Sequence, residues 1–239
     1  IISLVPSQSE FLWETGLHKE LIGITKFCIH PDELFSSVTR IGGTKKLNIE
    51  KIRSLKPDLI IGNKEENEKD QIEILQKEFN VWMSDIFSLN DAFEMMHKLG
   101  EICGKETEAE KIIERIKSSF NSIPGQHIAK AIYLIWKKPY IVAGKNTFID
   151  EMLNICGFEN QISGIRYPEL TEEKIKEINP EYILLSSEPF PFNEKHIAEL
   201  KSICPESEII LVDGELFSWY GSRLQFTAEY FLSLRKKTG

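Results

Sequence analysis

The sequence predicts an α/β fold with two similar lobes, and three observations support this prediction. One segment occurs twice at a constant offset of 123 residues: positions 50–66 read EKIRSLKPDLIIGNKEE and positions 173–189 read EKIKEINPEYILLSSEP. Short apolar runs alternate with helical patterns in both halves of the chain, which favours parallel strands joined by right-handed crossovers. Strand patterns are almost absent from 89 to 120, between the two halves.

Each copy of the duplicated segment predicts a helix followed by a buried strand. The helix is expected to end before Pro57 or Pro180, because a residue that precedes proline disfavours the helical conformation. The apolar runs at 59–61 and 182–185 are too short for buried helices and suit strands that are covered on both faces. A loop with a glutamate, Glu65 or Glu188, follows each strand.

The other elements follow from periodicity and from cap residues. In the first half a capping sequence at 7–10 precedes a helix that starts near Phe11, and a glycine turn at 40–46 leads into the helix at 49–55. Further strands are expected at 2–5, 21–25 and 81–83, with a further helix at 71–77. In the second half we expect strands at 131–136, 140–143 and 209–212, and helices at 147–155 and 223–235.

A long helix is predicted at 105–123, between the halves. Ile112, Ile113, Ile116 and Phe120 recur at helical spacing, and Pro124 stops the pattern. We therefore expect two Rossmann-like lobes with central parallel sheets joined by a single long backbone helix. The predicted division is an N-terminal lobe at 1–103, the linking helix at 104–123 and a C-terminal lobe at 124–239.

Composition limits the classes of function. The 239 residues suffice for two domains, and the net charge of −8 argues against a nucleic-acid partner. No run approaches the length of a membrane span. The four cysteines form no C-x-x-C pair and require no disulfide. The chain opens on a strand pattern without methionine, so we interpret it as a trimmed chain whose leader is not visible, and we expect a monomer.

Ligands of parallel sheets bind beyond the carboxyl ends of the strands, and aromatic and basic residues gather in these predicted loops. Three aromatic residues at 217–220 and Trp136 suit a large planar ligand, and several lysines favour an anionic one. Arg223 is expected to pair either with an acid of the ligand or with a buried carboxylate of its own lobe. The predicted ligand-binding residues are Ser7, Gln8, Phe27, His30, Lys45, Lys46, Asn63, Trp136, Lys137, Phe217, Trp219, Tyr220 and Arg223.

The histidine pattern disfavours a bare metal ion as the ligand. His30 is the one histidine in a predicted ligand loop, whereas a zinc or manganese site needs several converging ligands. We expect no catalytic cofactor and no direct metal site, with His30 as the one candidate for contact with a chelated metal.

Three motifs resemble substrate-binding proteins of ABC importers, of the class whose two lobes are joined by one long helix. They are SLVPSQSEFLWETG at 3–16, IGGTKKLNIEKIRSLKPDLIIGNKEEN at 41–67 and the LxxxCGFEN element at 153–160. The resemblance covers nearly the whole chain and implies a periplasmic or lipid-anchored extracytoplasmic protein. It implies a ligand such as vitamin B12, an iron–siderophore complex, haem or a metal, held in a cleft between the lobes. Asn63 stands where B12 binders have a tryptophan, so the ligand prediction stays open between a corrinoid (cobalamin) and a ferric siderophore.

The resemblance also implies a membrane partner. In this family one glutamate of each lobe docks onto arginines of the permease dimer, and the positions that match are Glu65 and Glu188. The first loop also carries Glu66 and Glu68, so its docking residue stays open. Paired carboxylates suit this role because each can form a bidentate contact with an arginine.

Two other classes of function remain as alternatives. The sequence has no nucleophile elbow, phosphate-binding loop, dinucleotide fingerprint or H-E-x-x-H motif, which argues against an enzyme. A cytoplasmic carrier or sensor of corrinoids or other metal chelates, with the same fold, is the second alternative. An apolar leader or a lipobox cysteine upstream of Ile1 would distinguish export from this alternative.

Overall fold

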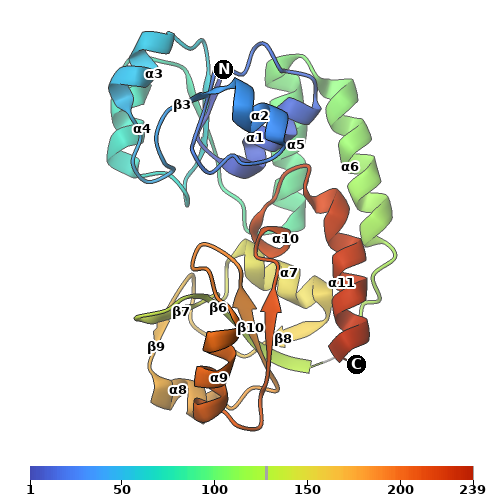
Figure 1. Cartoon of the computed structure of the whole chain (residues 1–239). Helices are drawn as coiled ribbons and strands as arrows, with labels where there is room; N and C mark the ends of the chain where they lie inside the picture. Colours follow the sequence, from blue (N-terminus) through green and yellow to red (C-terminus); the bar gives the residue numbers. More distant parts are fainter. Residues whose placement is uncertain (127–128, 239) are drawn as a thin grey trace. The chain divides into compact units, whose positions relative to one another are not determined.

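The computed structural model describes residues 1–126 and 129–238, which form two compact α/β units (Figure 1). The first unit contains Ile1–Ile86, Asn90–Lys117 and Trp219–Gln225, and the second contains Phe87–Leu89, Ser118–Ser218 and the chain from Phe226 onward. The predicted α/β class with two Rossmann-like lobes is confirmed.

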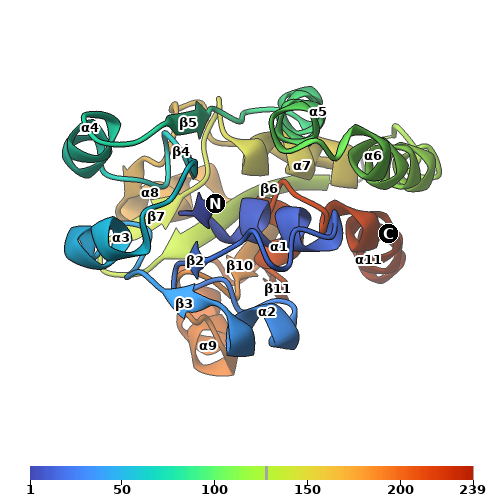
Figure 2. The same ribbon diagram turned by 90° about the horizontal axis from the view of Figure 1, so that it is seen from above.

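The first unit is built on a parallel five-stranded sheet of order β3-β2-β1-β4-β5 (Figure 2). Side chains of its inner strands are almost entirely buried, as the apolar runs predict. Its strands are β1 (Ile2–Ser3), β2 (Gly23–Ile24), β3 (Thr39–Arg40), β4 (Ile60–Asn63) and β5 (Val81–Ser84). The helices that alternate with them are α1 (Pro6–Glu14), α2 (Asp32–Ser37), α3 (Ile49–Leu55) and α4 (Lys69–Gln76).

The second unit has a mixed six-stranded sheet of order β11-β10-β6-β7-β9, with β8 beside β6. Strand β7 runs antiparallel to both β6 and β9, whereas a parallel sheet was predicted. The cause is the three-residue connection after Trp136, which allows a hairpin but no crossover. The strands are β6 (Ala129–Trp136), β7 (Tyr140–Val142), β8 (Phe158–Asn160), β9 (Glu169–Leu170), β10 (Tyr182–Ser186) and β11 (Glu208–Val212). The helices are α7 (Phe148–Cys156), α8 (Glu172–Ile178), α9 (Glu194–Ile203), α10 (Glu215–Ser218) and α11 (Leu224–Thr238).

The duplicated segment forms the same local structure in both units. The side chains of Asn48 and Thr171, which are equivalent at the offset of 123, accept hydrogen bonds from backbone N–H groups and cap α3 and α8. Both helices end at an equivalent left-handed residue before proline, Lys56 (φ 48°) and Asn179 (φ 43°). The strands that follow, β4 and β10, lie inside their sheets. The helix–strand repeat predicted from the sequence is therefore confirmed.

The helix predicted at 105–123 is present but shorter, and a helix that was not predicted precedes it. Helix α5 (Leu89–Cys103) precedes α6 (Glu106–Phe120), and the chain passes from the first unit to the second within α6, between Lys117 and Ser118. The predicted C-terminal lobe also differs, because Trp219–Gln225 belongs to the first unit.

Candidate ligand-binding site

In the first unit, the loop after β2 presents apolar side chains to solvent. Phe27 is 48% exposed and Ile29 is 43% exposed, while the Lys26 ammonium lies 5.0 Å from the centroid of the Phe27 ring. Between them the Cys28 thiol points inward and donates a hydrogen bond to the Ser9 hydroxyl (3.1 Å). Burial raises the pKa of the Cys28 thiol, so this group fixes the loop as a neutral side chain.

The loop after β4 is held by the buried side chain of Asn63. Its Oδ1 accepts hydrogen bonds from the backbone N–H groups of Glu65 (2.8 Å) and Glu66 (3.2 Å), and its Nδ2 donates to the Ser84 hydroxyl (3.0 Å). Asn63 therefore shapes the loop, and its burial argues against the predicted direct contact with a ligand. The equivalent residue of the second unit, Ser186, accepts a weaker bond from the N–H of Glu188 (3.4 Å).

Ser7 and Gln8 lie inside a helix and not in a loop before one. Helix α1 begins at Pro6, which suits the first helical position because proline lacks the N–H that would be unpaired there. Both side chains are buried, and Gln8 Nε2 donates to the Ser84 hydroxyl (2.7 Å). This position argues against their predicted roles as ligand contacts.

The aromatic segment after α10 is packed into the first unit. Trp219 and Tyr220 are both buried, and the Tyr220 hydroxyl donates to Glu66 Oε1 (2.6 Å). A Cβ at Gly221 would lie 2.1 Å from the Ser7 carbonyl oxygen. The backbone therefore lies so close to α1 that only glycine fits at this position. The position of these aromatic side chains argues against the predicted apolar wall of a ligand pocket.

Arg223 pairs with a buried carboxylate, but not with one of the C-terminal lobe to which the sequence assigned it, because Glu10 lies in the predicted N-terminal lobe. Its Nε and Nη2 donate to the two carboxylate oxygens of Glu10, at 3.0 and 2.8 Å. Burial raises the pKa of Glu10, and the Arg223 guanidinium opposes that rise. The same guanidinium lies 5.0 Å from the Trp219 ring, which also packs edge-on against His30 at 5.8 Å between ring centroids.

The predicted field of lysines is largely neutralised by local acids. Lys45 pairs with Glu68 (3.4 Å) and donates to the Glu65 carbonyl (2.8 Å), while Lys137 forms an ion pair with Glu199. Two other lysines of predicted ligand loops are also paired: Lys64 with Asp85 and Lys145 with Asp150, each at 3.1 Å. Lys46 is exposed. These four pairs weaken the basis for predicting an anionic ligand, although Lys26 and Lys138 are exposed as well.

In the second unit, an aromatic cluster lies at the carboxyl end of β6. Trp136 is 39% exposed and packs edge-on against Phe190, with ring centroids 5.5 Å apart. Phe190 packs in turn on the buried Phe192 at 4.7 Å. Phe217, by contrast, is fully buried against Tyr133, which argues against the predicted ligand contact.

The three predicted docking glutamates are partly buried, and two of them accept hydrogen bonds. Glu66 accepts from the Tyr220 hydroxyl, and Glu188 Oε1 accepts from the Ser218 hydroxyl (2.9 Å). Glu65 lies at the position equivalent to Glu188 in the repeat, with its backbone N–H bonded to Asn63. These bonds fix the loops that carry the carboxylates.

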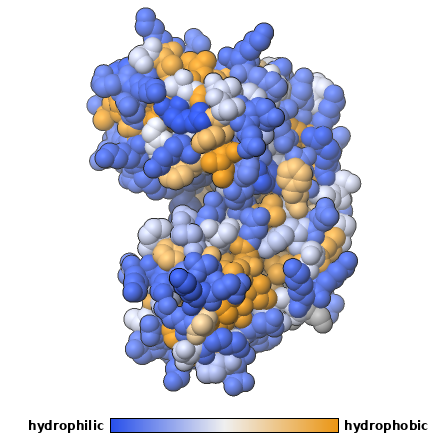
Figure 3. Space-filling model, in the orientation of Figure 1, coloured by the Kyte–Doolittle hydropathy of each residue, from blue (hydrophilic) through white to orange (hydrophobic). Residues whose placement is uncertain are grey.

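The sequence analysis missed several exposed apolar residues in these loops. Ile29 lies between Cys28 and His30, whereas Phe190 is half-buried and lies between two prolines. Ile165 is 67% exposed in the loop before β9, and the Arg166 guanidinium lies 5.1 Å from the ring of Phe87. For Ile165, the signal that would have found it is an isolated apolar residue between Gly164 and Arg166. Figure 3 shows hydrophobic residues among hydrophilic ones on the visible face of each unit.

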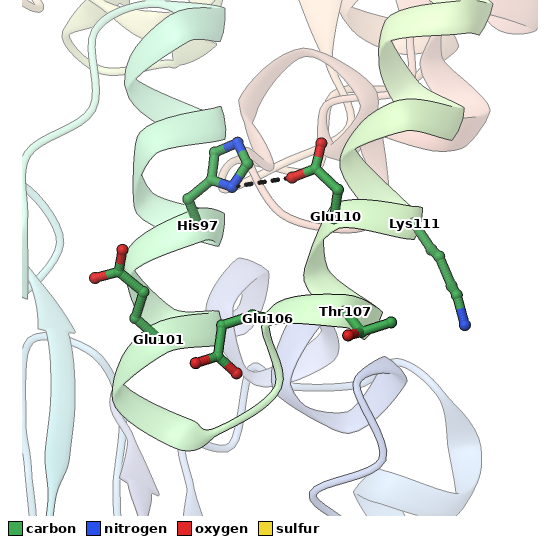
Figure 4. Close-up of a pocket in the computed structure, with 6 residues that line it drawn as sticks. All are labelled: His97, Glu101, Glu106, Thr107, Glu110 and Lys111. Atoms are coloured by element: carbon green, nitrogen blue, oxygen red, sulfur yellow. Dashed lines mark ion pairs between the residues drawn. The ribbon is translucent and has the colours of Figure 1, made fainter.

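A pocket of about 500 Å³ lies between α5 and α6 of the first unit, away from the carboxyl ends of the strands (Figure 4). His97 and Glu110 form its ion pair (3.2 Å), and its other lining residues are Glu101, Glu106, Thr107 and Lys111. Within residues 1–126 and 129–238, no group of three or more His, Cys, Asp and Glu side chains is arranged to hold a metal ion. No helix of the described part of the chain has the length and hydropathy needed to cross a membrane.

Residues 1–202 match the family model described as Periplasmic binding protein. The chain belongs to this family. Among the relatives of this periplasmic binding protein, an uncharacterized ABC transporter substrate-binding lipoprotein of Bacillus subtilis, YvrC, is 28% identical over 199 residues. That alignment covers 77% of this chain, but the chain spans only 62% of the length of YvrC.

Two further relatives carry ligand names. A vitamin B12-binding protein of Pectobacterium carotovorum is 23% identical over 245 residues, which cover 98% of this chain and 87% of that protein. The crystal structure of the vitamin B12-binding protein BtuF of Vibrio cholerae matches with a TM-score of 0.83 at 20% identity, over 99% of this chain and 96% of that one. At this identity the structural likeness supports the fold of the periplasmic binding protein. The family is one of binding proteins, which agrees with the prediction that the chain is not an enzyme.

Proposed function

We propose that this protein is the substrate-binding component of an ABC importer that works outside the cytoplasm. It would capture a bulky metal chelate, either a corrinoid such as vitamin B12 or a ferric siderophore, and deliver it to a membrane permease. The observation that carries the ligand class is the set of exposed apolar side chains at the carboxyl ends of the strands, where parallel sheets bind ligands.

In each unit we propose a small set of ligand contacts. Phe27 and Ile29 are the contacts of the first unit, and Trp136 and Phe190 are those of the second. Aromatic faces of this kind suit the flat, largely apolar surface of a corrin ring or of an aromatic chelator. Because the neighbouring lysines pair with acids, the ligand is proposed to bind through apolar contacts more than through charge.

Relatives support the corrinoid alternative, since two of them are named for vitamin B12. The experiment that decides is a titration of the purified protein with cyanocobalamin, with a ferric hydroxamate siderophore and with hemin. Quenching of tryptophan emission reports binding, and Trp136 is one of four tryptophans. We expect saturable quenching by one ligand class that Trp136→Ala weakens. No saturable response to any of the three would refute the proposed ligand class.

We also propose that Glu65 and Glu188 dock the protein onto the permease. Their equivalent positions in the repeat suit a two-fold partner, and carboxylates pair well with arginines. Such pairs chiefly set orientation and association rate. The double variant Glu65→Gln/Glu188→Gln removes both charges but keeps an acceptor for the Ser218 hydroxyl, so it should keep its ligand affinity and melting temperature but lose transport. Glu33→Gln/Glu94→Gln, which changes two exposed acids outside these loops, is the matched control. Unchanged transport by the docking variant would refute this role.

A further inference from the structure

The loop of residues 187–193, which we call the Phe190 loop, carries both a docking candidate and a ligand-contact candidate. Glu188 lies near its start, and Phe190 lies against Trp136 at 5.5 Å between ring centroids. What fixes the far end of this loop therefore matters for both proposed roles. That end is the first turn of α9, where Asn193 is the N-cap.

A histidine completes the cap of α9 in the place where glutamate or glutamine is usual. The backbone N–H of Asn193 donates to His196 Nδ1 at 3.0 Å. In return the Asn193 side chain accepts from the backbone of the first turn. The His196 ring also packs edge-on against Phe190 and Phe192, each at 5.3 Å between centroids. One side chain thus bonds the end of the loop and supports its aromatic residue.

This bond requires the neutral form of the ring. Nδ1 accepts a hydrogen bond only while it carries no proton, so the ring proton of the neutral form is on Nε2. A protonated ring is a donor at both nitrogens and cannot accept from the Asn193 N–H. Imidazole rings of histidine ordinarily gain this proton at about pH 6.5, within the range that an extracytoplasmic protein meets.

We propose that His196 is a positioning residue for ligand binding. Its neutral ring fixes the Phe190 loop so that Phe190 stays against Trp136, and protonation of the ring releases the loop. The effect of His196 on ligand binding rests on the proposed function. Its effect on the state of the Phe190 loop does not.

The charged groups around the ring favour this release. Glu199, one turn further along α9, attracts a protonated His196, and its carboxylate already binds Lys137 from the β6–β7 turn and the Tyr140 hydroxyl (2.8 Å). A protonated ring is therefore drawn toward Glu199 and away from the Asn193 N–H. The other charged groups next to His196 along α9 are Glu194 and Lys195, and Glu172 on α8 acts on Tyr140.

His196→Gln tests whether protonation of the ring releases the loop. Glutamine supplies an acceptor at the same helix position but cannot gain a proton, whereas His196→Ala removes the acceptor at every pH. Amide NMR signals of Asn193 and Phe190 are followed from about pH 8 to about pH 5, a range that spans histidine titration. We expect one step in the wild type, coincident with titration of the His196 ring signals, and none in His196→Gln. His196→Ala should resemble the acid form throughout.

Binding of cyanocobalamin is measured on the same proteins. Loss of one hydrogen bond predicts an affinity about threefold weaker in acid for the wild type, with no such change for His196→Gln. An Asn193 signal without a step, or an equal step in His196→Gln, would overturn the role of His196 in the loop. A step without a change in affinity would overturn its role in ligand binding. If cyanocobalamin does not bind at any pH, the corrinoid assignment fails, and the NMR result still decides whether His196 positions the loop.

Discussion

Removing the Arg223 side chain tests how the segment 219–225 is held to the first unit. The Glu10 residue is only 4% exposed and receives two hydrogen bonds from Arg223, at 3.0 and 2.8 Å. Arg223→Ala leaves this carboxylate buried without its cation. Breaking a buried ion pair from one side typically costs about 3–5 kcal/mol of stability. We expect a loss of that size in the free energy of unfolding near neutral pH.

The loss should also depend on pH, with a defined sign. Burial raises the pKa of Glu10, and in the variant Arg223 no longer opposes this rise. A carboxyl group with a higher pKa in the folded state than in the unfolded state stabilises the fold fully at pH values below its unfolded-state pKa. This contribution to stability is lost as the pH rises through its folded-state pKa. The variant is therefore expected to approach the wild type in acid and to fall behind it toward neutral pH. Adding Glu10→Gln, which cannot ionise, should abolish this dependence.

Urea unfolding followed by circular dichroism at about pH 5 and about pH 7.5 measures both effects, since these values span the range in which a raised carboxyl pKa acts. Arg53→Ala is the control, because Arg53 pairs with Glu50 and Glu78 in solvent and such pairs contribute little. A loss below about 1 kcal/mol at neutral pH would contradict the cost of leaving a buried charge unpaired. An equal loss at both pH values would show that ionisation of Glu10 is not its cause.

Three further substitutions have expected outcomes. Gly221→Ala places a Cβ 2.1 Å from the Ser7 carbonyl oxygen, so it should lower the melting temperature sharply, whereas Gly125→Ala, with open space around it, should not. Phe217→Ala should cost about 3–5 kcal/mol in urea unfolding, because it empties a core site; a neutral result would mean that the ring is not packed there. Asn63→Ala leaves two loop N–H groups without their acceptor and should cost about 2 kcal/mol. If amide exchange across residues 64–67 stays unchanged in that variant, Asn63 does not hold the loop.

The sequence determined the parts of the fold that depend on local interactions. The duplicated segment became α3–β4 and α8–β10 because its caps, its apolar runs and the prolines that follow its helices act within a few residues. The loops at the carboxyl ends of the strands could be predicted for the same reason, because the alternation of strands and helices shows where each strand ends. Phe27 was thereby located in an exposed loop, and Trp136 at the exposed carboxyl end of β6.

Only the tertiary structure decided which side chains of those loops face solvent and which charges are paired. Arg223 and Glu10 are 213 positions apart, and Lys137 and Glu199 are 62 apart. No sequence periodicity relates such distant positions. The acidic partners of the lysines therefore could not be identified from the sequence, and the predicted positive field could not be corrected for them. The run of aromatic residues at 217–220 likewise gave no sign that it packs inside, because burial depends on the surfaces that other segments bring to it.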